Sequence, residues 1–227
     1  TSCGYIIAEK HIMGTEVTAE GFCSGGKHRT LAMSSKTHFR PGIASSLLYP
    51  ADIKEDIYAA IQGINDKFVE SSGMLFGITH AEYMIDANGN IFLIEIAARG
   101  GGTLISSNII KWTSGVDVYQ LLLQCLLGKS PAIESIALDK KAALLQFFEF
   151  SSGRVEKIVG VEAAQELEHV YKIEMGFKEG DILNNAKDDR TRHGYAIILA
   201  DTVDQIKATI NKVNDMISVI TYDSANI

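Results

Sequence analysis

The sequence predicts an α+β protein, with an antiparallel sheet flanked by helices and a second, smaller α+β domain behind it. Three observations support this fold class. Short apolar segments with alternating polarity are separated by glycine turns in the first third of the chain. Two later segments repeat apolar residues at helical spacing. Ser130-Pro131 interrupts the pattern, so we expect one domain over residues 1–130 and another over residues 131–227.

Composition limits the kinds of function to consider. The chain has 227 residues, of which 46% are hydrophobic and 22% charged, as in ordinary globular proteins. Its formal net charge of -7 argues against a general nucleic-acid partner. No apolar run approaches the roughly 20 residues that a membrane-spanning helix needs, and no signal peptide is visible. We therefore expect a cytoplasmic protein with neither a nucleic acid nor a membrane as partner.

Two further features concern the thiols and the start of the chain. Cys3, Cys23 and Cys125 are scattered and lack metal-binding spacing, which favours reduced thiols, and Cys125 fits a small core residue. The chain starts at Thr1 without a methionine and enters an apolar segment at once. We therefore expect a piece of a longer polypeptide.

An antiparallel meander is expected at the start. Residues 5–12 and 16–23 read as strands, Ser24-Gly25-Gly26 as a hairpin turn, and residues 27–35 as a third strand. Residues 36–42 form a polar, basic loop in this interpretation. That loop is either a solvated connection, or Lys36 or Arg40 faces an anionic ligand.

Two helices are expected around the middle of the chain. The first follows Pro50-Ala51-Asp52 and ends at Gly73. Its predicted inner face consists of Ile57, Ala60, Ile61, Ile64 and Phe68. A capping box at residues 114–117 predicts the second, which Gly128 closes. Its predicted inner face consists of Tyr119, Leu122, Leu123 and Leu126.

The second domain reads as alternating strands and helices with no evident chemistry. Strands are expected at residues 141–150, 154–159, 169–175 and 195–199, with a turn at 151–153, a short acidic helix at 161–168 and a loop or weak hairpin at 180–194. Thr202 caps a last helix in this interpretation. Its predicted inner stripe is Val203, Ile206, Ile210, Val213 and Ile217.

The segment from Gly73 to Gly102 carries the main functional signal. Asn88-Gly89 is a strong hairpin signal between two apolar strands. With these as the two turn residues, Asp86 faces Ile91, and Glu82 falls directly opposite Glu95. A longer turn with a bulge would shift this register.

Two carboxylates opposed across a ladder repel each other and favour a cation between them. Oxygen ligands alone suit a hard ion such as Mg²⁺, usually shared with phosphates. Arg99 lies on the same face as Glu95 and enters the turn Gly100–Gly102, whose bare backbone could approach an anion. The alternative is a solvated face with two ordinary acids, but the apolar neighbours of Glu95 indicate a buried strand.

Two motifs together resemble the ATP-grasp enzymes. The run Ile7-Ala8-Glu9-Lys10-His11-Ile12-Met13-Gly14-Thr15-Glu16-Val17 resembles their hinge strand. The run Phe92-Leu93-Ile94-Glu95-Ile96-Ala97-Ala98-Arg99-Gly100-Gly101-Gly102, with the Glu82 strand before it, looks like their metal-binding hairpin. The resemblance covers residues 5–127 in the right order and implies that ATP binds between two sheets.

The resemblance implies roles in nucleotide binding for the first motif. The backbone of Glu9, Lys10, His11 and Ile12 would bond the adenine edge, with Ile12 packing near the base. Glu16 would accept hydrogen bonds from the ribose hydroxyls, for which a carboxylate offers acceptors only.

The second motif is implied to handle the phosphates. Glu82 and Glu95 would hold Mg²⁺, or Mn²⁺ in its place, against the phosphates of ATP. Arg99 would steady the transferred phosphoryl group or a bound carboxylate, and the loop Gly100–Gly102 would receive an acyl phosphate. The implied activity is that of a ligase that phosphorylates a small-molecule carboxylate with ATP and joins it to an amine or a thiol.

Two alternative functions are left open, and the sequence differs from the family pattern in two places. The alternatives are an enzyme acting on bicarbonate, similar to carbamoyl-phosphate synthase or biotin carboxylase, and a nucleotide-binding module without catalysis. Ala97 stands where the family often has Asn. The amino-terminal part that completes the family's nucleotide cleft would precede Thr1, so we expect residues 1–227 alone to be inactive or weakly active. A homodimer is left open.

Overall fold

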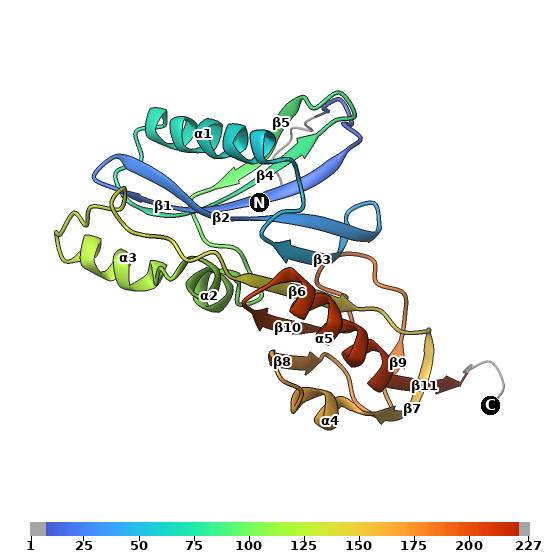
Figure 1. Ribbon diagram of the computed structural model, residues 1–227. Coiled ribbons are helices and arrows are strands. Elements are labelled where there is room, and N and C mark those ends of the chain that lie inside the picture. The colour runs from blue at the N-terminus through green and yellow to red at the C-terminus, as the bar shows by residue number, and fades with distance from the viewer. Residues whose placement is uncertain (1–7, 223–227) are drawn as a thin grey trace.

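The computed structural model describes residues 8–222 and consists of one large antiparallel sheet with helices on both faces, followed by a small three-stranded sheet (Figure 1). This confirms the predicted fold class. The order across the large sheet is β5 (Ile91–Ala97), β4 (Gly77–Ile85), β1 (Thr15–Ser24), β2 (Lys27–Arg40), β3 (Ile43–Tyr49), β6 (Ala142–Phe148), β10 (Gly194–Ala200) and β8 (Val170–Met175). The small sheet contains β11 (Ser218–Tyr222), β7 (Gly153–Val159) and β9 (Ile182–Leu183).

Helices cover the large sheet on opposite faces. The helical segments are α1 (Glu55–Ser71), the π-helix η1 (Ile105–Ile109), α2 (Ile110–Ser114), α3 (Val118–Leu126), α4 (Val161–Gln165) and α5 (Val203–Met216). Helix α1 lies on one face of the β1–β4 region, whereas α2 and α3 lie beneath it (Figure 1). In the part of the chain that the structure describes, no helix is both long and apolar enough to cross a bilayer.

The large sheet continues past the expected seam at residues 130–131. Strand β3 pairs with β6 through Ser46 and Gln146, so strands from before and after the seam share one sheet. The division at residue 130 therefore stays a prediction about folding units and does not mark an edge of the sheet.

The meander is longer than the sequence pattern indicates. Residues 36–40, expected as a loop, continue β2, and residues 43–49 form a strand that the pattern did not predict. Pairing between these two segments, interrupted by bulges near His38, supplies the backbone hydrogen bonds that keep the polar stretch extended. The strand expected at residues 5–12 is not found in its described portion, residues 8–12, and residues 1–7 lie outside the described range.

The inner faces of α1 and α3 are rotated from those expected. In α1 the buried residues are Ile61, Asn65 and Val69, while Ile64 and Phe68 are each 44% exposed. Asn65 turns inward because its amide accepts a hydrogen bond from the Tyr83 hydroxyl at 3.0 Å and donates one to Thr30 at 2.9 Å. Such polar anchors cannot be detected from apolar periodicity alone.

Helix α3 differs from the predicted helix in its first residue and in the residues that face the core. Asp117 is the N-cap and accepts a hydrogen bond from the Gln120 amide at 3.0 Å, whereas Ser114 ends α2. Leu121 and Cys125 are buried, but Leu123 is 62% exposed, so the expected inner face is wrong except at Leu122, which packs partly buried against the core. The prediction for α5 is confirmed, because Thr202 forms its capping box and Ile206, Ile210 and Val213 are buried.

A bidentate ion pair connects the end of β2 to the C-terminal part of the chain. The Arg40 guanidinium donates to both Glu149 oxygens at 2.8 and 2.7 Å and also donates to the Ala186 carbonyl. The hydrogen bonds from Arg40, opposed by partial burial, lower the pKa of Glu149 to about 2. Arg40 thus has a protein carboxylate as its partner, contrary to the idea that it faces a ligand.

The Arg40–Glu149 pair predicts an acid-dependent contribution to stability. Because the pKa of Glu149 in the folded protein lies near 2, below the ordinary value of about 4.3, the contribution is complete above pH 4.3 and disappears as the pH falls towards 2. Chemical unfolding of the wild type and of Glu149→Gln from pH 2 to pH 7 should therefore show a stability difference that shrinks below about pH 4.3. Glu156→Gln, at an exposed position of β7, is the control. A difference independent of pH would contradict the assignment.

Candidate active site

A polar row runs along one face of β1, β2 and β4, the face opposite α1. In the register of these strands, Glu20 pairs with His80 and Thr18 with Glu82, while Lys36 of β2 pairs with Glu16. Side chains two residues apart on one strand share a face, so these groups point the same way. The opposite face holds apolar side chains that pack beneath α1.

The structure pairs Glu82 with Glu95 across β4 and β5. The turn and the strand pairing that produce this register differ from those expected. The turn spans Asp86–Asn90, so Ile91 pairs with Ile85 and not with Asp86. A bulge at Ile94 then adds one residue to β5 and restores the pairing of the two acids. The longer turn is held by the Asp86 carboxylate, which accepts hydrogen bonds from the Asn88 and Asn90 amides.

Glu82 is held by two cationic neighbours. Its Oε1 atom accepts a hydrogen bond from Lys36 Nζ at 3.1 Å and lies 3.5 Å from His80 Nε2. The adjacent His80 is the largest influence on the pKa of Glu82 and, with Lys36, lowers it to about 2 against the effect of burial. Glu82 is therefore ionised at neutral pH, as a metal ligand must be.

Lys36 joins the expected nucleotide-binding acid to the expected metal-binding acid. Its Nζ atom lies 2.6 Å from Glu16 Oε1 and 3.1 Å from Glu82 Oε1. Burial opposes the charge of Lys36, but the two carboxylates outweigh it and raise its pKa. His38 Nε2 lies 3.0 Å from the other Glu16 oxygen. Lys36, like Arg40, thus has protein carboxylates as its partners, and a role for it facing an anionic ligand stays a prediction.

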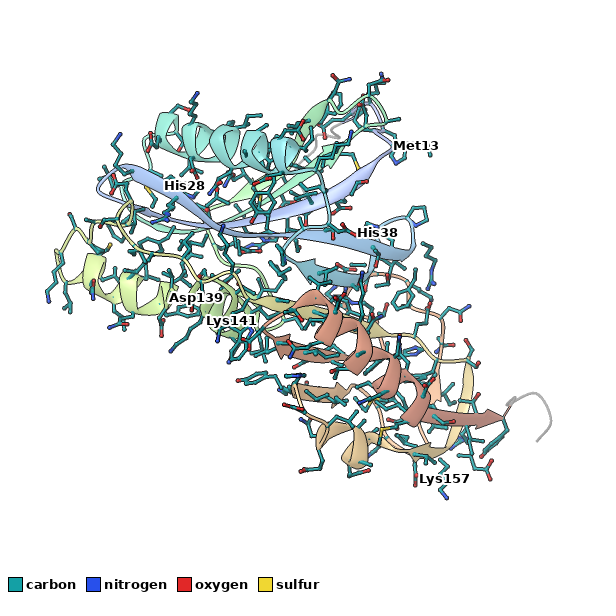
Figure 2. All side chains as sticks on the ribbon, in the orientation of Figure 1. Met13, His28, His38, Asp139, Lys141 and Lys157 are labelled. Atoms are coloured by element: carbon teal, nitrogen blue, oxygen red, sulfur yellow. The ribbon has the colours of Figure 1, made fainter. Side chains whose placement is uncertain are left out.

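These residues line a pocket of about 300 Å³. Its walls are Glu16, Lys36, His38, Gly42, Ala44, Glu82, Met84, Ile94 and Asp189. Figure 2 places His38 where β2 and β3 meet, on the side of the molecule towards the C-terminal part. Asp189 comes from the 184–193 loop and is fixed by the Ala44 amide at 3.1 Å and by Arg192 at 3.2 Å. The pocket thus draws on both parts of the chain.

Strand β5 is more open than its sequence indicates. Glu95 and Arg99 are 59% and 60% exposed in their side chains and lie 3.7 Å apart. Ile94 is 50% exposed, so the expectation of a buried strand around Glu95 is wrong. The reason is that β5 forms the edge of the large sheet and has a neighbour on one side only.

The glycine turn after Arg99 has an unusual backbone. Thr103 and Leu104 adopt left-handed conformations, with φ of 46° and 61°, which costs about 1–2 kcal/mol per residue. The π-helix η1 follows at once. Backbone strain and π-helical turns are both frequent at functional sites. Both support the loop after Arg99 as part of the site.

The expected adenine-binding residues are placed apart from this pocket. Glu9, Lys10 and His11 are exposed and Ile12 is partly exposed, in a segment without regular structure. None of these four residues lines the pocket that contains Glu16. Their role in binding a nucleotide stays a prediction.

The sequence interpretation missed Glu20 of the polar row and two pocket residues, His38 and Asp189. Glu20 could have been found from the alternation of Glu16, Thr18 and Glu20 along one strand, which places all three on one face. His38 lay in a segment expected to be a loop. Asp189 carries no local signal, since only the tertiary fold brings it to Ala44.

The donor set fits a divalent cation that is shared with phosphates. Glu82 and Glu95 supply oxygen only, as Mg²⁺ prefers, and Mg²⁺ commonly uses one or two carboxylates together with substrate phosphates. Within residues 8–222, no three His, Cys, Asp or Glu side chains converge on a metal position. The two acids would therefore hold the ion together with ligands from substrate and water.

Gly101 is predicted to be less replaceable than Gly102, the next residue of the turn. A Cβ there would lie 2.9 Å from Glu20 Oε1 and 3.0 Å from Ile105, whereas at Gly102 it would meet nothing within 4 Å. Gly101→Ala should lower the free energy of unfolding by about 1–3 kcal/mol, since a close-packed site must shift. Gly102→Ala should stay within about 0.5 kcal/mol of the wild type. Urea denaturation of both variants tests this, and equal effects would contradict the packing described here.

Comparison with protein families identifies both parts of the chain. Residues 2–108 match the ATP-grasp domain, and residues 146–222 match the L-amino acid ligase C-terminal domain 2. Comparison with curated proteins gave no significant match.

Solved structures share the fold at low sequence identity. The L-amino acid ligase from Bacillus licheniformis is 24% identical, with a TM-score of 0.80 over 94% of this chain and 53% of its own. Phosphoribosylglycinamide synthetase from Anaerococcus prevotii is 17% identical, with a TM-score of 0.78 over 94% of this chain and 55% of its own. Biotin carboxylase from Campylobacter jejuni is 18% identical, with a TM-score of 0.69 over 94% of this chain and 48% of its own.

The chain thus spans about half the length of these relatives. The resemblance to ATP-grasp enzymes is confirmed. The chain combines an ATP-grasp domain with an L-amino acid ligase C-terminal domain 2.

Proposed function

We propose that this chain is part of a ligase that uses Mg-ATP to activate the carboxylate of an L-amino acid and joins it to an amine. The pairing of Glu82 with Glu95, beside a glycine turn and Arg99, is the observation that carries this proposal. The L-amino acid ligase domain over residues 146–222 supports an amino acid as the carboxylate. It favours an amine over a thiol as the acceptor, and an amino acid over bicarbonate as the acid.

Each residue has a role that its surroundings support. Glu82 and Glu95 would hold the cation against the phosphates, and the cation would supply charge neutralisation there. Glu16 would accept hydrogen bonds from the ribose, while Lys36 bridges Glu16 and Glu82 and offsets their repulsion. Arg99, 60% exposed at the mouth of the glycine turn, would bind the transferred phosphoryl group.

The proposed reaction has two steps. A carboxylate oxygen of the amino acid attacks the γ-phosphorus of ATP, the bond to the β-phosphate oxygen breaks, and ADP leaves. The amine of the second substrate then attacks the acyl carbon, inorganic phosphate leaves, and the amine loses a proton. Binding, orientation and charge stabilisation by the protein account for most of such catalysis.

The two acids should be required for metal-dependent nucleotide binding. In the protein that contains residues 1–227, Glu82→Gln and Glu95→Gln should each weaken Mg²⁺-dependent ATP binding about tenfold or more, since each removes a charged oxygen ligand. Amino-acid-dependent phosphate release should be lost in both variants. Isothermal titration calorimetry and a phosphate-release screen of paired L-amino acids measure these effects. Glu162→Gln, on the exposed side of α4, is the control.

Three results would count against the proposal. Unchanged Mg²⁺-dependent binding in Glu95→Gln would remove its metal role. ATP binding without amino-acid-dependent phosphate release would favour a nucleotide-binding module. Phosphate release that depends on bicarbonate and not on amino acids would favour the carboxylase-type alternative.

A further inference from the structure

Glu20 and His80 form an ion pair behind Glu82 that the proposed reaction does not use directly. His80 Nδ1 lies 2.5 Å from Glu20 Oε1, and the Glu20 side chain is only 2% exposed. The second oxygen, Oε2, is buried and has no protein hydrogen-bond partner among the described residues. A buried carboxylate is costly unless it is paired, so a fold that keeps one here needs a reason.

The other side of the His80 ring faces the proposed metal ligand. Its Nε2 atom lies 3.5 Å from Glu82 Oε1, the same oxygen that Lys36 approaches at 3.1 Å. In the part of the chain that the structure describes, both cationic neighbours of Glu82 therefore meet Oε1. This arrangement leaves Oε2 of Glu82 as the oxygen available to a cation.

Glu20 also supports the glycine turn. The position of a Cβ at Gly101 would be 2.9 Å from Glu20 Oε1, so the turn backbone packs too closely against this carboxylate to leave room for a side chain. The same oxygen accepts the hydrogen bond from His80. One buried carboxylate thus connects the turn that would receive phosphate with the acid that would hold the metal.

We propose that Glu20 and His80 are positioning residues of the phosphate and metal site. His80 holds Glu82 by Oε1 so that Oε2 faces the cation, and Glu20 fixes both the His80 ring and the backbone at Gly101. This inference rests on the proposed metal role of Glu82 and Glu95. It adds two residues to the site that act through others and do not touch the substrate.

A purely structural histidine on the same sheet provides a matched comparison. His28 Nδ1 lies 2.8 Å from Asp66 and its Nε2 lies 2.8 Å from Thr79. Like His80 it is buried, but its partner Asp66 belongs to α1, which covers the face opposite the polar row, and Figure 2 places His28 on β2 beneath that helix. Replacing His28 should therefore affect stability without reaching the metal site.

The test measures the Mg²⁺ requirement for ATP binding in the protein that contains this chain. Titration calorimetry with ATP at a series of Mg²⁺ concentrations gives the half-saturating Mg²⁺ for the wild type, Glu20→Gln, His80→Gln and His28→Gln. We expect this value to rise about tenfold or more in Glu20→Gln and His80→Gln, as when groups that orient metal ligands are removed. In His28→Gln it should stay unchanged while the melting temperature falls.

The outcomes separate this inference from the proposed function. A wild type that shows no Mg²⁺-dependent ATP binding overturns the proposed function, and this inference with it. A normal wild type with unchanged Mg²⁺ requirement in both Glu20→Gln and His80→Gln overturns the inference alone. If His80→Gln does not fold by circular dichroism, Glu20→Gln, which keeps the side-chain shape, decides. Loss of folding in both variants shows a structural role and overturns the inference.

Discussion

Four carboxylates share one region of the sheet, and their mutual repulsion is balanced mainly by Lys36 and His80. Glu16 and Glu20 lie on β1, and Glu82 and Glu95 lie on the paired strands β4 and β5. Lys36 bridges Glu16 and Glu82, whereas the pKa of His80 rises to about 9 because its interactions with Glu20 and Glu82 outweigh the effect of burial. Without these cations, like charges this close would destabilise the strands that carry them. The site therefore depends on this charge balance.

The charge balance is uneven across the site. Glu82 is three-quarters buried and has two cationic partners, but Glu95 is 59% exposed and, among the described residues, forms one ion pair, with Arg99 at 3.7 Å. An exposed ion pair of this kind contributes little to stability. In the proposed metal site, Glu95 and Arg99 would therefore be free to rearrange around an incoming phosphate and cation, while Glu82 would stay fixed. One rigid and one adaptable acid would suit a cation that arrives together with the nucleotide.

The sequence was sufficient to predict those parts of the site that rest on local geometry. Strand alternation and the Asn88-Gly89 turn placed Glu82 opposite Glu95, although a longer turn and a compensating bulge at Ile94 produce the pairing. Strand β3 and the extension of β2 could not be predicted, because pairing between two polar segments decides them. The inward position of Asn65 depends on its hydrogen bonds to Tyr83 and Thr30, which apolar periodicity does not reveal.

The pocket also needs the C-terminal part of the chain, for which the sequence pattern indicated no chemistry. Asp189 accepts a hydrogen bond from the Ala44 amide while its partner Arg192 donates to the Ala44 carbonyl at 3.2 Å, so the loop binds β3 by both backbone groups. Arg40 and Glu149 add a second connection between the same regions. Together they fix the end of β2 that carries His38, and thereby the wall of the pocket beside Glu16. The C-terminal part thus shapes the pocket from outside the ATP-grasp match, which makes it a structural component of the site and not an appendage.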